Sequence, residues 1–368
     1  MKIGITGNKG FVGRHLSNYL SIQKDIEVIP FENDYFDDIE KMQSFVSACD
    51  AIVHLAAVNR HEDAQYLYDK NIALADVLVD ACIKAKASPH IIFSSSSQEA
   101  LENLYGNAKK TARLKIENWA AEYHGKATGL IIPNVFGPFG KPNYNSVVAT
   151  FCHKICRGET PQIIQDSQIS LVYVNELIED IYQEILNPRL GKVEIAARHH
   201  VKVSELLEKL KYFHATYLVG NEFPSLNITF DLALFNTFRC YVPHEHYPVK
   251  FKKNTDPRGT FIELARTNSS GQTSYSLTNP DYTRGNHFHT RKAERFAVIQ
   301  GKALIQLRKI DSDEVISYEL DGENPAFVDM PIWHTHNIKN IGEETLLTVF
   351  WINEPFDEKN PDTYFINV

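Results

Sequence analysis

Short apolar runs and amphipathic stretches alternate along the first half of the chain. The apolar runs occupy residues 2–6, 26–29, 51–55, 90–93 and 128–132, and segments of helical period lie between them at 11–20, 72–87 and 109–123. Such alternation predicts βαβ units, in which helices cover both faces of a parallel sheet. Residues 140–240 are less regular, and we expect one helix there at 204–214.

The pattern changes near residues 241–247, where Pro243 and Pro248 flank a polar stretch. Beyond it, short strands are expected at 272–277, 294–299, 303–308, 315–320 and 346–351, separated by turn residues at roughly regular spacing. This spacing is typical of a small all-β sandwich or barrel. We therefore predict two domains, an α/β domain over residues 1–244 and an all-β domain over residues 245–368.

The composition agrees with two globular domains. A length of 368 residues exceeds the about 250–300 residues at which a single core stops growing. No run reaches the about 18 apolar residues of a membrane span, and glycines interrupt the N-terminal segment where a signal peptide would be apolar. We therefore expect a cytoplasmic protein without membrane insertion. The net charge of −8 argues against nucleic acid as a partner. The cysteines are scattered and are expected to be reduced core thiols: Cys49, Cys82, Cys152, Cys156 and Cys240.

Gly7, Gly10 and Gly13 directly follow the first predicted strand and open the first predicted helix. In this context the first glycine permits a sharp turn, the second lets the backbone approach a pyrophosphate, and the third lets the helix pack on the strand. The N-terminus of the helix then offers N–H groups to the phosphates. A glycine pattern alone also fits an ordinary turn, but the strand–loop–helix order predicts a Rossmann dinucleotide site. The predicted cofactor-binding residues are Gly7, Lys9, Gly10, Phe11, Val12, Gly13, Leu55, Ala56, Tyr105 and Lys109.

The spacing of these glycines resembles that of the extended short-chain dehydrogenase/reductases, and so does His54-Leu55-Ala56-Ala57 at the end of a buried strand. The resemblance implies a nicotinamide cofactor. Glu32 and Asp34 lie after the second strand, where an acidic residue binds the ribose of NAD. Lys9 precedes the second glycine, as in many NADP-using members, where it would meet the 2′-phosphate. We favour NADP(H), with NAD as the alternative.

Tyr105 and Lys109 form a Y-x-x-x-K pattern. Positions i and i+4 share one face of a helix, so the ammonium is expected beside the phenol, where it would stabilise phenolate and lower the pKa of the tyrosine. Upstream, residues 94–97 are serines that follow a buried strand, and one hydroxyl is expected to polarise a substrate carbonyl. The resemblance favours Ser96 as the third catalytic residue, with Ser95 and Ser97 as alternatives. A chance surface pair would not occur in this order of motifs.

Asn134 lies in Pro133–Pro138, a segment that resembles the R-x-x-N-v-[FY]-G-P element through which extended members contact sugar nucleotides. Ile131 stands where arginine is usual, so that one contact is in doubt. The segment 173–176 resembles a further element, Y-V-[DN]-[DE], which we interpret as architectural. The predicted substrate-binding residues are Asn59, Asn134, Asn143 and Asn145.

The C-terminal half carries two segments that resemble the motifs of a cupin, a jelly-roll barrel. His287, His289 and Glu294 fit the first motif, and His336 fits the second, in which Trp333 replaces the usual glycine. Residues two apart on a strand point to the same face, so His287 and His289 can both face inward. A lone histidine is usually structural, but three imidazoles and a carboxylate on two motifs predict a site for Zn²⁺ or another first-row divalent ion. His334 shares the spacing and is a spare ligand candidate.

A second resemblance involves the same barrel. The segments 256–263 and 284–287 look like the D-x-R-G-x-F-x-E and R-G-x-H elements of dTDP-4-keto-sugar 3,5-epimerases, which are cupins without metal. In those enzymes the last histidine removes a proton next to the ketone, so His287 is assigned twice, as ligand and as base. One nitrogen cannot serve both roles. We favour the ligand, because the rest of the metal set is present.

Taken whole, the sequence closely resembles the bacterial CapF/WbjC/FnlB family of capsule and O-antigen enzymes. The segments 141–147 and 361–365 are specific to this resemblance, because general reductases and cupins lack them. The family implies a bifunctional step toward UDP-N-acetyl-L-fucosamine. The cupin epimerises C3 of a UDP-2-acetamido-2,6-dideoxy-4-keto-hexose, and the reductase then reduces the C4 ketone with NADPH to give UDP-N-acetyl-6-deoxy-L-talosamine. Family members are also homodimers through the cupin.

Two other hypotheses stay open at this point. In one, only the reductase acts, and the cupin is a dimerisation or stability module. In the other, the chain is a non-enzymatic NADP sensor, a class that usually lacks a Tyr–Lys pair such as Tyr105 and Lys109. Deuterium exchange next to the ketone separates the bifunctional hypothesis from the first of these.

Overall fold

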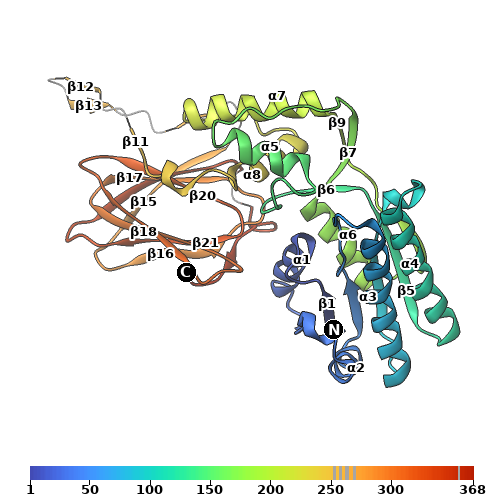
Figure 1. Ribbon diagram of the computed structural model, residues 1–368. Coiled ribbons are helices and arrows are strands. Elements are labelled where there is room, and N and C mark those ends of the chain that lie inside the picture. Colours follow the sequence, from blue (N-terminus) through green and yellow to red (C-terminus); the bar gives the residue numbers. More distant parts are fainter. Residues whose placement is uncertain (252–253, 257–258, 262–264, 268–270, 355–356) are drawn as a thin grey trace. The chain divides into compact units, whose positions relative to one another are not determined.

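The computed structural model describes residues 1–368 except 252–253, 257–258, 262–264, 268–270 and 355–356. For residues 254–256, 259–261, 266–267 and 272 it describes the backbone alone. The chain forms two compact units. The first contains Met1–Thr150 and Gln165–Val203, and the second contains Phe151–Ile164 and Ser204–Val368 (Figure 1).

A parallel six-stranded sheet forms the centre of the first unit, in the order β2-β1-β3-β4-β5-β8. Its strands are β1 (Lys2–Thr6), β2 (Glu27–Ile29), β3 (Ala51–His54), β4 (His90–Ser96), β5 (Lys126–Ile132) and β8 (Gly191–Glu194). The inner strands are largely apolar and buried along most of their length, because helices cover both of their faces. Helices α1 (Phe11–Ser21) and α6 (Val174–Leu186) pack together, and α3 (Ala64–Ala85) packs between α2 (Ile39–Ala48) and α4 (Leu104–Glu122). The predicted parallel α/β domain is confirmed.

The order of the strands creates a topological switch point between β1 and β3. The chain passes from β1 to β2 on one side and then crosses to β3 on the other side of β1. Open α/β sheets bind their ligands at the carboxyl ends of the strands at such a point. The loop 7–10 follows β1, and Leu55 and Ala56 follow β3. The topology therefore places the two predicted cofactor segments side by side.

A smaller sheet completes the first unit. It consists of β6 (Asn134–Phe136), β7 (Gln168–Tyr173) and β9 (His199–Lys202), with β7 in the middle. Short helical turns lie at η1 (Asn33–Phe36) and η2 (Ser97–Ala100), and α5 (Val147–Ile155) runs from the end of the first unit into the second. The turn η2 is important below, because it joins the serine run to the helix that carries Tyr105.

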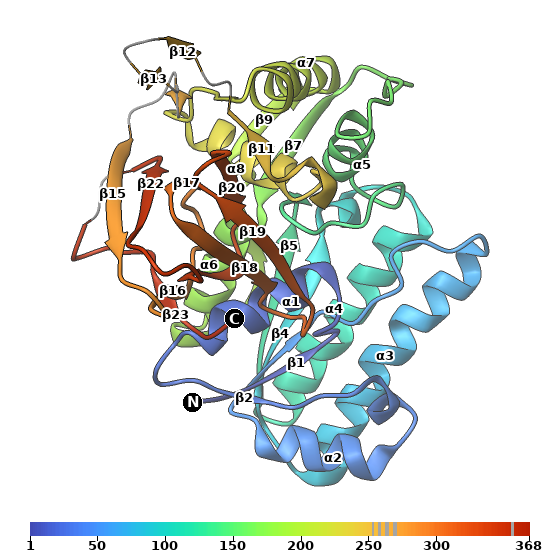
Figure 2. The same cartoon turned by 90° about the vertical axis from the view of Figure 1, so that its left-hand side faces the viewer.

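Two antiparallel five-stranded sheets dominate the second unit (Figure 2). One has the order β11-β20-β17-β22-β15 and the other the order β19-β18-β21-β16-β23. Alternate side chains from both sheets, among them Val298, Ile305, Val328 and Ile338, form one apolar core, as expected for a jelly-roll barrel. The strands are β11 (Val249–Lys250), β15 (Gln272–Thr278), β16 (Thr283–Phe288), β17 (Glu294–Gln300), β18 (Lys302–Lys309), β19 (Val315–Asp321), β20 (Ala326–Met330), β21 (His334–Asn340), β22 (Leu346–Ile352) and β23 (Tyr364–Phe365). The predicted all-β region is confirmed.

Helices also belong to the second unit. They are α7 (Val203–Phe213), which coincides with the predicted helix, η3 (His214–Val219), α8 (Thr229–Arg239) and η4 (His244–His246). Minor strands are β10 (Glu222–Phe223), β12 (Asn254–Asp256), β13 (Gly259–Phe261) and β14 (Arg266–Thr267). Contacts thus group residues 204–244 with the antiparallel sheets. The domain boundary that we place after residue 244 stays a prediction about which segments make up each working domain.

Candidate active sites

The glycine loop after β1 has the geometry of a phosphate cradle. Gly7 has φ +70°, and a Cβ atom there would lie 2.7 Å from the backbone nitrogen of Ala56. A Cβ at Gly13 would lie 2.2 Å from the carbonyl oxygen of Gly7, so only glycine lets α1 start this close to the strand. Gly10 caps α1 without a side-chain hydrogen bond, and the first turn contains no acidic residue. The helix N-terminus therefore fits the pyrophosphate of a dinucleotide.

His54 links the two strand ends beside this loop. Its Nδ1 lies 2.7 Å from the hydroxyl of Thr6, which in turn accepts the Ala56 amide at 3.3 Å. Burial, with a smaller effect from the ammonium of Lys109, lowers the pKa of His54 to about 3. A neutral, buried imidazole that is stacked on Phe93 holds β1 and β3 together and does not take up a second proton at neutral pH.

Lys9 and Glu32, the two residues on which the choice of cofactor depends, form an ion pair with each other. Their Nζ and Oε2 atoms are 2.6 Å apart, and both side chains are more than half exposed. Asp34, the other acidic candidate, pairs with Lys41 instead, at 2.7 Å. The region after β2 therefore holds both the Lys9 ammonium, which suits a 2′-phosphate, and the Glu32 carboxylate, which suits the hydroxyls of a ribose.

Tyr105 and Lys109 lie one turn apart at the start of α4, but they contact different groups. The Tyr105 hydroxyl donates to Oδ1 of Asn59 at 3.1 Å. The Lys109 ammonium is buried, donates to the carbonyl oxygen of Ser94 at 2.8 Å and lies 5.0 Å from the centre of the Phe93 ring. The helix thus brings the lysine to the end of β4, directly beneath the serine run.

The pKa shifts of this pair differ from the sequence prediction. Burial, with a smaller effect from Tyr144, raises the pKa of Tyr105 to about 12, whereas we predicted that Lys109 would lower it. The reason is that the ammonium bonds to the Ser94 carbonyl instead of the phenol. Burial also lowers the pKa of Lys109 to about 8, against the opposing charge of Glu99. Tyr105 therefore keeps its proton at neutral pH, as a proton donor to a ketone must.

The serines at the end of β4 divide into bound and available hydroxyls. The hydroxyl of Ser94 donates to the His54 carbonyl at 3.1 Å, and that of buried Ser95 donates to Glu99. The Ser96 hydroxyl accepts from the Gln98 amide at 3.2 Å, which leaves its own proton for another acceptor. This arrangement supports Ser96 over Ser95 as the group that faces a substrate carbonyl.

Two of the predicted substrate residues gather beside Tyr105. Asn59 accepts from the tyrosine through its side chain and from the Asn145 amide, at 3.4 Å, through its backbone. Asn143 lies in the same loop with φ +54°, and its amide donates to Thr150 at 2.9 Å. Asn134 is exposed at the start of β6 and lies outside this hydrogen-bonded group. Ile131, where arginine is usual, is buried in β5 and thus belongs to the core.

Sequence reasoning missed an ion-pair network beneath these residues. Arg113 forms two hydrogen bonds to Glu99, at 2.9 and 2.8 Å, and two to Glu117, at 2.8 and 2.9 Å. Its side chain and that of Glu99 are both more than nine-tenths buried. The signal was present, because Tyr105, Lys109 and Arg113 repeat every four residues along one face of α4. The network ties η2, which follows the serines, to the catalytic helix.

The four predicted metal ligands come together in the second unit. His287 from β16 pairs with His336 from β21 across the sheet, His289 directly follows β16, and Glu294 begins β17. One ligand atom from each of these residues lies within 4.8 Å of those of the other three. The rings of His287 and His336 are centred 4.7 Å apart. Three imidazoles and one carboxylate on a barrel wall are a donor set for a first-row divalent ion.

The hydrogen bonds of the histidines orient them toward a shared centre. Nδ1 of His289 bonds to the carbonyl oxygen of Asp362, and Nδ1 of His336 lies 3.2 Å from the carbonyl oxygen of His334. A carbonyl accepts an N–H, so Nδ1 carries a proton in both rings and Nε2 is the nitrogen that can turn a lone pair to an ion. These Nε2 atoms lie 3.0 and 3.3 Å from the same Glu294 oxygen, and that of His336 is buried without a hydrogen bond. The residues therefore fit a metal.

The charge states of His287 and Glu294 fit as well, whereas, despite burial, the Glu294 carboxylate raises the pKa of His289, whose second proton an ion would replace. Burial, with help from the two neighbouring imidazoles, lowers the pKa of His287 to about 4, so this ring is neutral at neutral pH. Burial disfavours the charged form of Glu294, but His289 and His336 hold its pKa well below its usual value. Metal binding requires neutral imidazole and ionised carboxylate.

Two details of the second cupin segment differ from simple motif reading. Trp333 has φ +57°, the left-handed conformation for which the motif uses glycine, and its buried ring stacks on Phe288 at 5.4 Å. His334, the spare ligand candidate, is outside the group of four; its Nδ1 lies 3.0 Å from the Ile332 carbonyl. Spacing alone predicted a shared face, but this local hydrogen bond holds the His334 ring at the start of the strand.

The residues of the epimerase resemblance are only partly described. Residues 257–258 and 262–263 lie outside the described residues, and for Asp256 and 259–261 only the backbone is described. Arg284 is exposed, and its guanidinium donates to the Thr278 hydroxyl and to the Leu277 carbonyl, both at 3.0 Å. The R-G-x-H segment is therefore present on β16, with His287 in the group of four.

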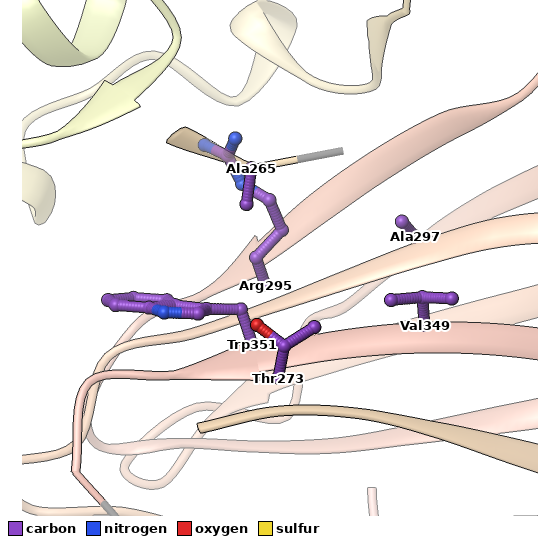
Figure 3. A pocket seen from close by; sticks show the side chains of 6 residues that line it. All are labelled: Ala265, Thr273, Arg295, Ala297, Val349 and Trp351. Carbon is purple, nitrogen blue, oxygen red and sulfur yellow. The ribbon is translucent and has the colours of Figure 1, made fainter. Parts of the chain in front are cut away.

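A cavity of about 140 Å³ in the second unit is separate from this group (Figure 3). It is lined by Ala265, Thr273, Arg295, Ala297, Val349 and Trp351, from β15, β17, β22 and the residue before β14. Arg295 follows Glu294 on β17 and so points to the opposite face of the sheet. Its guanidinium already bonds to both oxygens of Asp329, at 2.8 and 3.1 Å.

Among the described residues, no helix combines the length and the apolar character that crossing a membrane requires.

Comparison with known proteins covers the whole chain. Residues 3–195 match the model of the NAD dependent epimerase/dehydratase family, and residues 254–364 match the polysaccharide biosynthesis C-terminal domain. The chain is 33% identical over 379 residues to the UDP-2-acetamido-2,6-beta-L-arabino-hexul-4-ose reductase of Pseudomonas aeruginosa, with 100% of this chain and 99% of the relative covered.

Solved structures give the same result. The capsular polysaccharide assembling protein CapF from Staphylococcus aureus is 34% identical, with a TM-score of 0.64 and 100% of both chains covered. UDP-glucose 4-epimerase from Thermotoga maritima is 25% identical, with a TM-score of 0.51, over 58% of this chain and 82% of that one. The chain thus belongs to the NAD dependent epimerase/dehydratase family and, within it, to the CapF-type proteins that join this domain to a polysaccharide biosynthesis C-terminal domain.

Proposed function

We propose that the chain is a bifunctional enzyme of capsule or O-antigen synthesis that acts on a UDP-linked 4-keto sugar. The cupin epimerises C3 of a UDP-2-acetamido-2,6-dideoxy-4-keto-hexose, and the N-terminal domain reduces the C4 ketone, giving UDP-N-acetyl-6-deoxy-L-talosamine on the route to UDP-N-acetyl-L-fucosamine. The observation that carries the reductase half of this proposal is the full-length match to a UDP-4-keto-sugar reductase, and the group of His287, His289, Glu294 and His336 supports the epimerase half. A protonated Tyr105, whose hydroxyl bonds to Asn59 in the loop after β3, supports the reductase half.

In the reduction, Tyr105 donates the proton. Burial keeps its hydroxyl protonated, and Asn59, to which it bonds, comes from the loop after β3 and approaches the substrate side. The Ser96 hydroxyl donates a hydrogen bond to the same carbonyl oxygen, keeps its proton and so polarises the ketone. The nicotinamide, when bound at the glycine loop, supplies the hydride to C4. Asn134, Asn143 and Asn145 are proposed to bind the sugar nucleotide.

For the cofactor we propose NADP(H), bound with the 2′-phosphate at Lys9. The support is the position of Lys9 beside the glycine loop, at the end of β2. Glu32 opposes this choice, because its carboxylate already neutralises the same ammonium at 2.6 Å. NADP(H) binding therefore requires Lys9 to exchange a carboxylate for a phosphate.

For the epimerisation we propose that His287, His289, Glu294 and His336 hold a divalent ion, with Zn²⁺ as the first candidate. A C4 ketone acidifies the C–H bond at C3, and an ion held by these residues would supply a Lewis acid for the negative charge that develops on the ketone oxygen when a base takes the C3 proton. His287 is assigned as a ligand, since its ring lies with the other three and is neutral. The Nδ1–carbonyl hydrogen bonds of His289 and His336 fix which nitrogen each ring offers.

We also propose a cytoplasmic location and a homodimer formed through the cupin. The first is supported by five free thiols, Cys49, Cys82, Cys152, Cys156 and Cys240, of which the first four are buried. The second rests on the family resemblance, and measurement of the mass in solution tests it.

The decisive experiment is incubation with the 4-keto UDP-sugar in D₂O without NADPH. Deuterium at C3 is expected if the cupin is active, and adding NADPH should then convert the ketone to the alcohol. Loss of metal and of exchange in His289→Ala, with reduction of an already epimerised substrate retained, would tie the exchange to the cupin. Reduction without any exchange would contradict the bifunctional proposal.

A single-function 4-keto-sugar reductase is the second candidate. It is favoured by the name of the Pseudomonas aeruginosa relative, which describes a reductase alone. In that case the cupin serves dimerisation or stability, the D₂O experiment gives no exchange, and NADPH is consumed at the same rate by wild type and His289→Ala.

A further inference from the structure

The C-terminal segment 360–365 is tied to the metal-ligand loop by an unusual density of hydrogen bonds. Residues 290–292 form the turn between His289 and Glu294, and the segment reaches them from about seventy positions further along the chain. Arg291 donates to the carbonyl and the side chain of Asn360, at 3.1 and 3.2 Å. The buried ammonium of Lys292 donates to the carbonyl of Pro361 at 2.6 Å.

Asp362 is at the centre of these contacts. Its side chain is fully buried and accepts four hydrogen bonds from the turn. Oδ1 accepts from the amide and the hydroxyl of Thr290, at 3.1 and 2.7 Å. Oδ2 accepts from the amides of Arg291 and Lys292, at 3.0 and 3.2 Å. A carboxylate has four acceptor sites of this kind, whereas an amide side chain has only two.

The backbone of Asp362 contacts a metal ligand directly. Its carbonyl oxygen accepts the Nδ1–H of His289, and it lies in the left-handed region, with φ +41°. The next residues continue as β23, which pairs with β16 at His287 and Phe288, and the ring of Tyr364 stacks on Phe288 at 5.3 Å. The side chain of Asp362 thus fixes the turn, and its carbonyl fixes the ring that the turn carries.

We propose that Asp362 is a positioning residue of the metal site, which acts through His289. The inference rests on the proposed metal site. The carboxylate of Asp362 anchors residues 290–292 and so holds the Asp362 carbonyl beside Nδ1 of His289. Because this carbonyl accepts the Nδ1–H, the ring presents Nε2 to the ion. Partners of this type typically contribute about 10–100-fold to metal affinity.

The test is Asp362→Asn in the full-length protein, which keeps the size of the side chain but replaces acceptor sites with donors. Zn²⁺ affinity is measured by competition with a chromophoric chelator, and the absorption spectrum of the Co²⁺-loaded protein reports the ligand set. We expect Zn²⁺ to bind about 10–100-fold more weakly and the Co²⁺ bands to change. The matched control is Asp357→Asn, an exposed turn aspartate that accepts from the Lys359 amide at 2.9 Å and should leave both readouts unchanged.

A wild-type circular dichroism spectrum and thermal unfolding of the metal-free variant serve as the check on folding, because reduction by the N-terminal domain does not report the state of the barrel. If Asp362→Asn folds normally and binds Zn²⁺ with wild-type affinity and an unchanged Co²⁺ spectrum, the inference is overturned. If this variant does not fold, Thr290→Val decides, because it removes the 2.7 Å hydroxyl bond to Asp362 and leaves the amide bond in place: several-fold weaker Zn²⁺ binding supports the inference, and unchanged binding overturns it. If the wild-type protein binds no Zn²⁺ or Co²⁺, the proposed metal site itself fails, an outcome distinct from normal metal binding in Asp362→Asn.

Discussion

The two candidate sites hold their side chains in different ways. In the first site the Tyr105 hydroxyl donates to a loop asparagine and the Lys109 ammonium donates to a strand carbonyl. The Ser96 hydroxyl accepts a hydrogen bond, so its own proton can be donated to a substrate. Around Glu294, in contrast, the histidines His289 and His336 are each fixed at one nitrogen by a main-chain carbonyl and face the same carboxylate with the other. The first arrangement needs cofactor and substrate to complete it. The second already brings together four side chains that could hold a divalent ion.

This contrast predicts that the two sites fail independently. The largest effect is expected for Tyr105→Phe, which removes the proton donor and should lower the rate of reduction about 10²–10⁴-fold. Deuterium exchange at C3 should continue. Tyr123→Phe, an exposed tyrosine at the end of the same helix, is the control and should reduce normally. A wild-type rate in Tyr105→Phe, measured as NADPH oxidation, would show that the catalytic assignment is wrong.

Metal should stabilise the second unit alone. At a free Zn²⁺ concentration about 100 times its Kd, binding adds about 2.7 kcal/mol to the free energy of unfolding. Thermal unfolding with and without a chelator measures this difference, while reduction of an already epimerised substrate should not change. The independence of the two sites would be contradicted if the chelator stopped reduction. The metal site would be contradicted if the midpoint of thermal unfolding were the same with and without Zn²⁺.

The pH dependence of reduction should report Lys109. Burial lowers the pKa of Lys109 to about 8, so its amine is charged below that pH and neutral above it. If the positive charge is needed, kcat/KM falls about tenfold per pH unit above the pKa. Lys109→Met should lose this alkaline limb, and Lys110→Met, its exposed neighbour, should retain it. A limb that persists in Lys109→Met must come from another group.

The smallest effect concerns the choice of cofactor. Glu32→Gln frees Lys9 from its carboxylate partner and should shift the ratio of NADH to NADPH dissociation constants up to about fivefold toward NADPH, the range expected for an exposed pair. Lys9→Gln should shift the ratio the other way. Fluorescence titration of both nucleotides gives the ratio, with Glu122→Gln, an exposed residue at the end of α4, as the control. No shift in either variant would remove this pair from cofactor selection.

The sequence predicted what depends on local spacing. Three glycines after a strand, a tyrosine and a lysine one turn apart, and two histidines two residues apart each define a geometry within a single element, and the structure contains all three. The strand alternation likewise predicted both sheet types, because burial on one face or on two leaves different patterns.

Contacts between distant segments could not be predicted in this way. Lys9 favours NADP and Glu32 favours NAD, and their ion pair joins residues 23 positions apart. Lys109 bonds to the Ser94 carbonyl and therefore does not lower the pKa of Tyr105. This bond depends on how closely α4 packs on β4. Asp362 lies 73 positions from His289. No periodicity in one element indicates which carbonyl from another will meet it.

Trp333 shows that a motif letter can stand for a backbone angle. Its φ of +57° keeps the conformation for which cupins use glycine, at a cost of about 1–2 kcal/mol for a residue with a Cβ atom. Stacking on Phe288 offsets part of that cost. A sequence pattern that requires glycine at this position would miss this barrel. A pattern that also allows a large aromatic residue here, together with a second aromatic that stacks on it, would include this barrel and other diverged cupins.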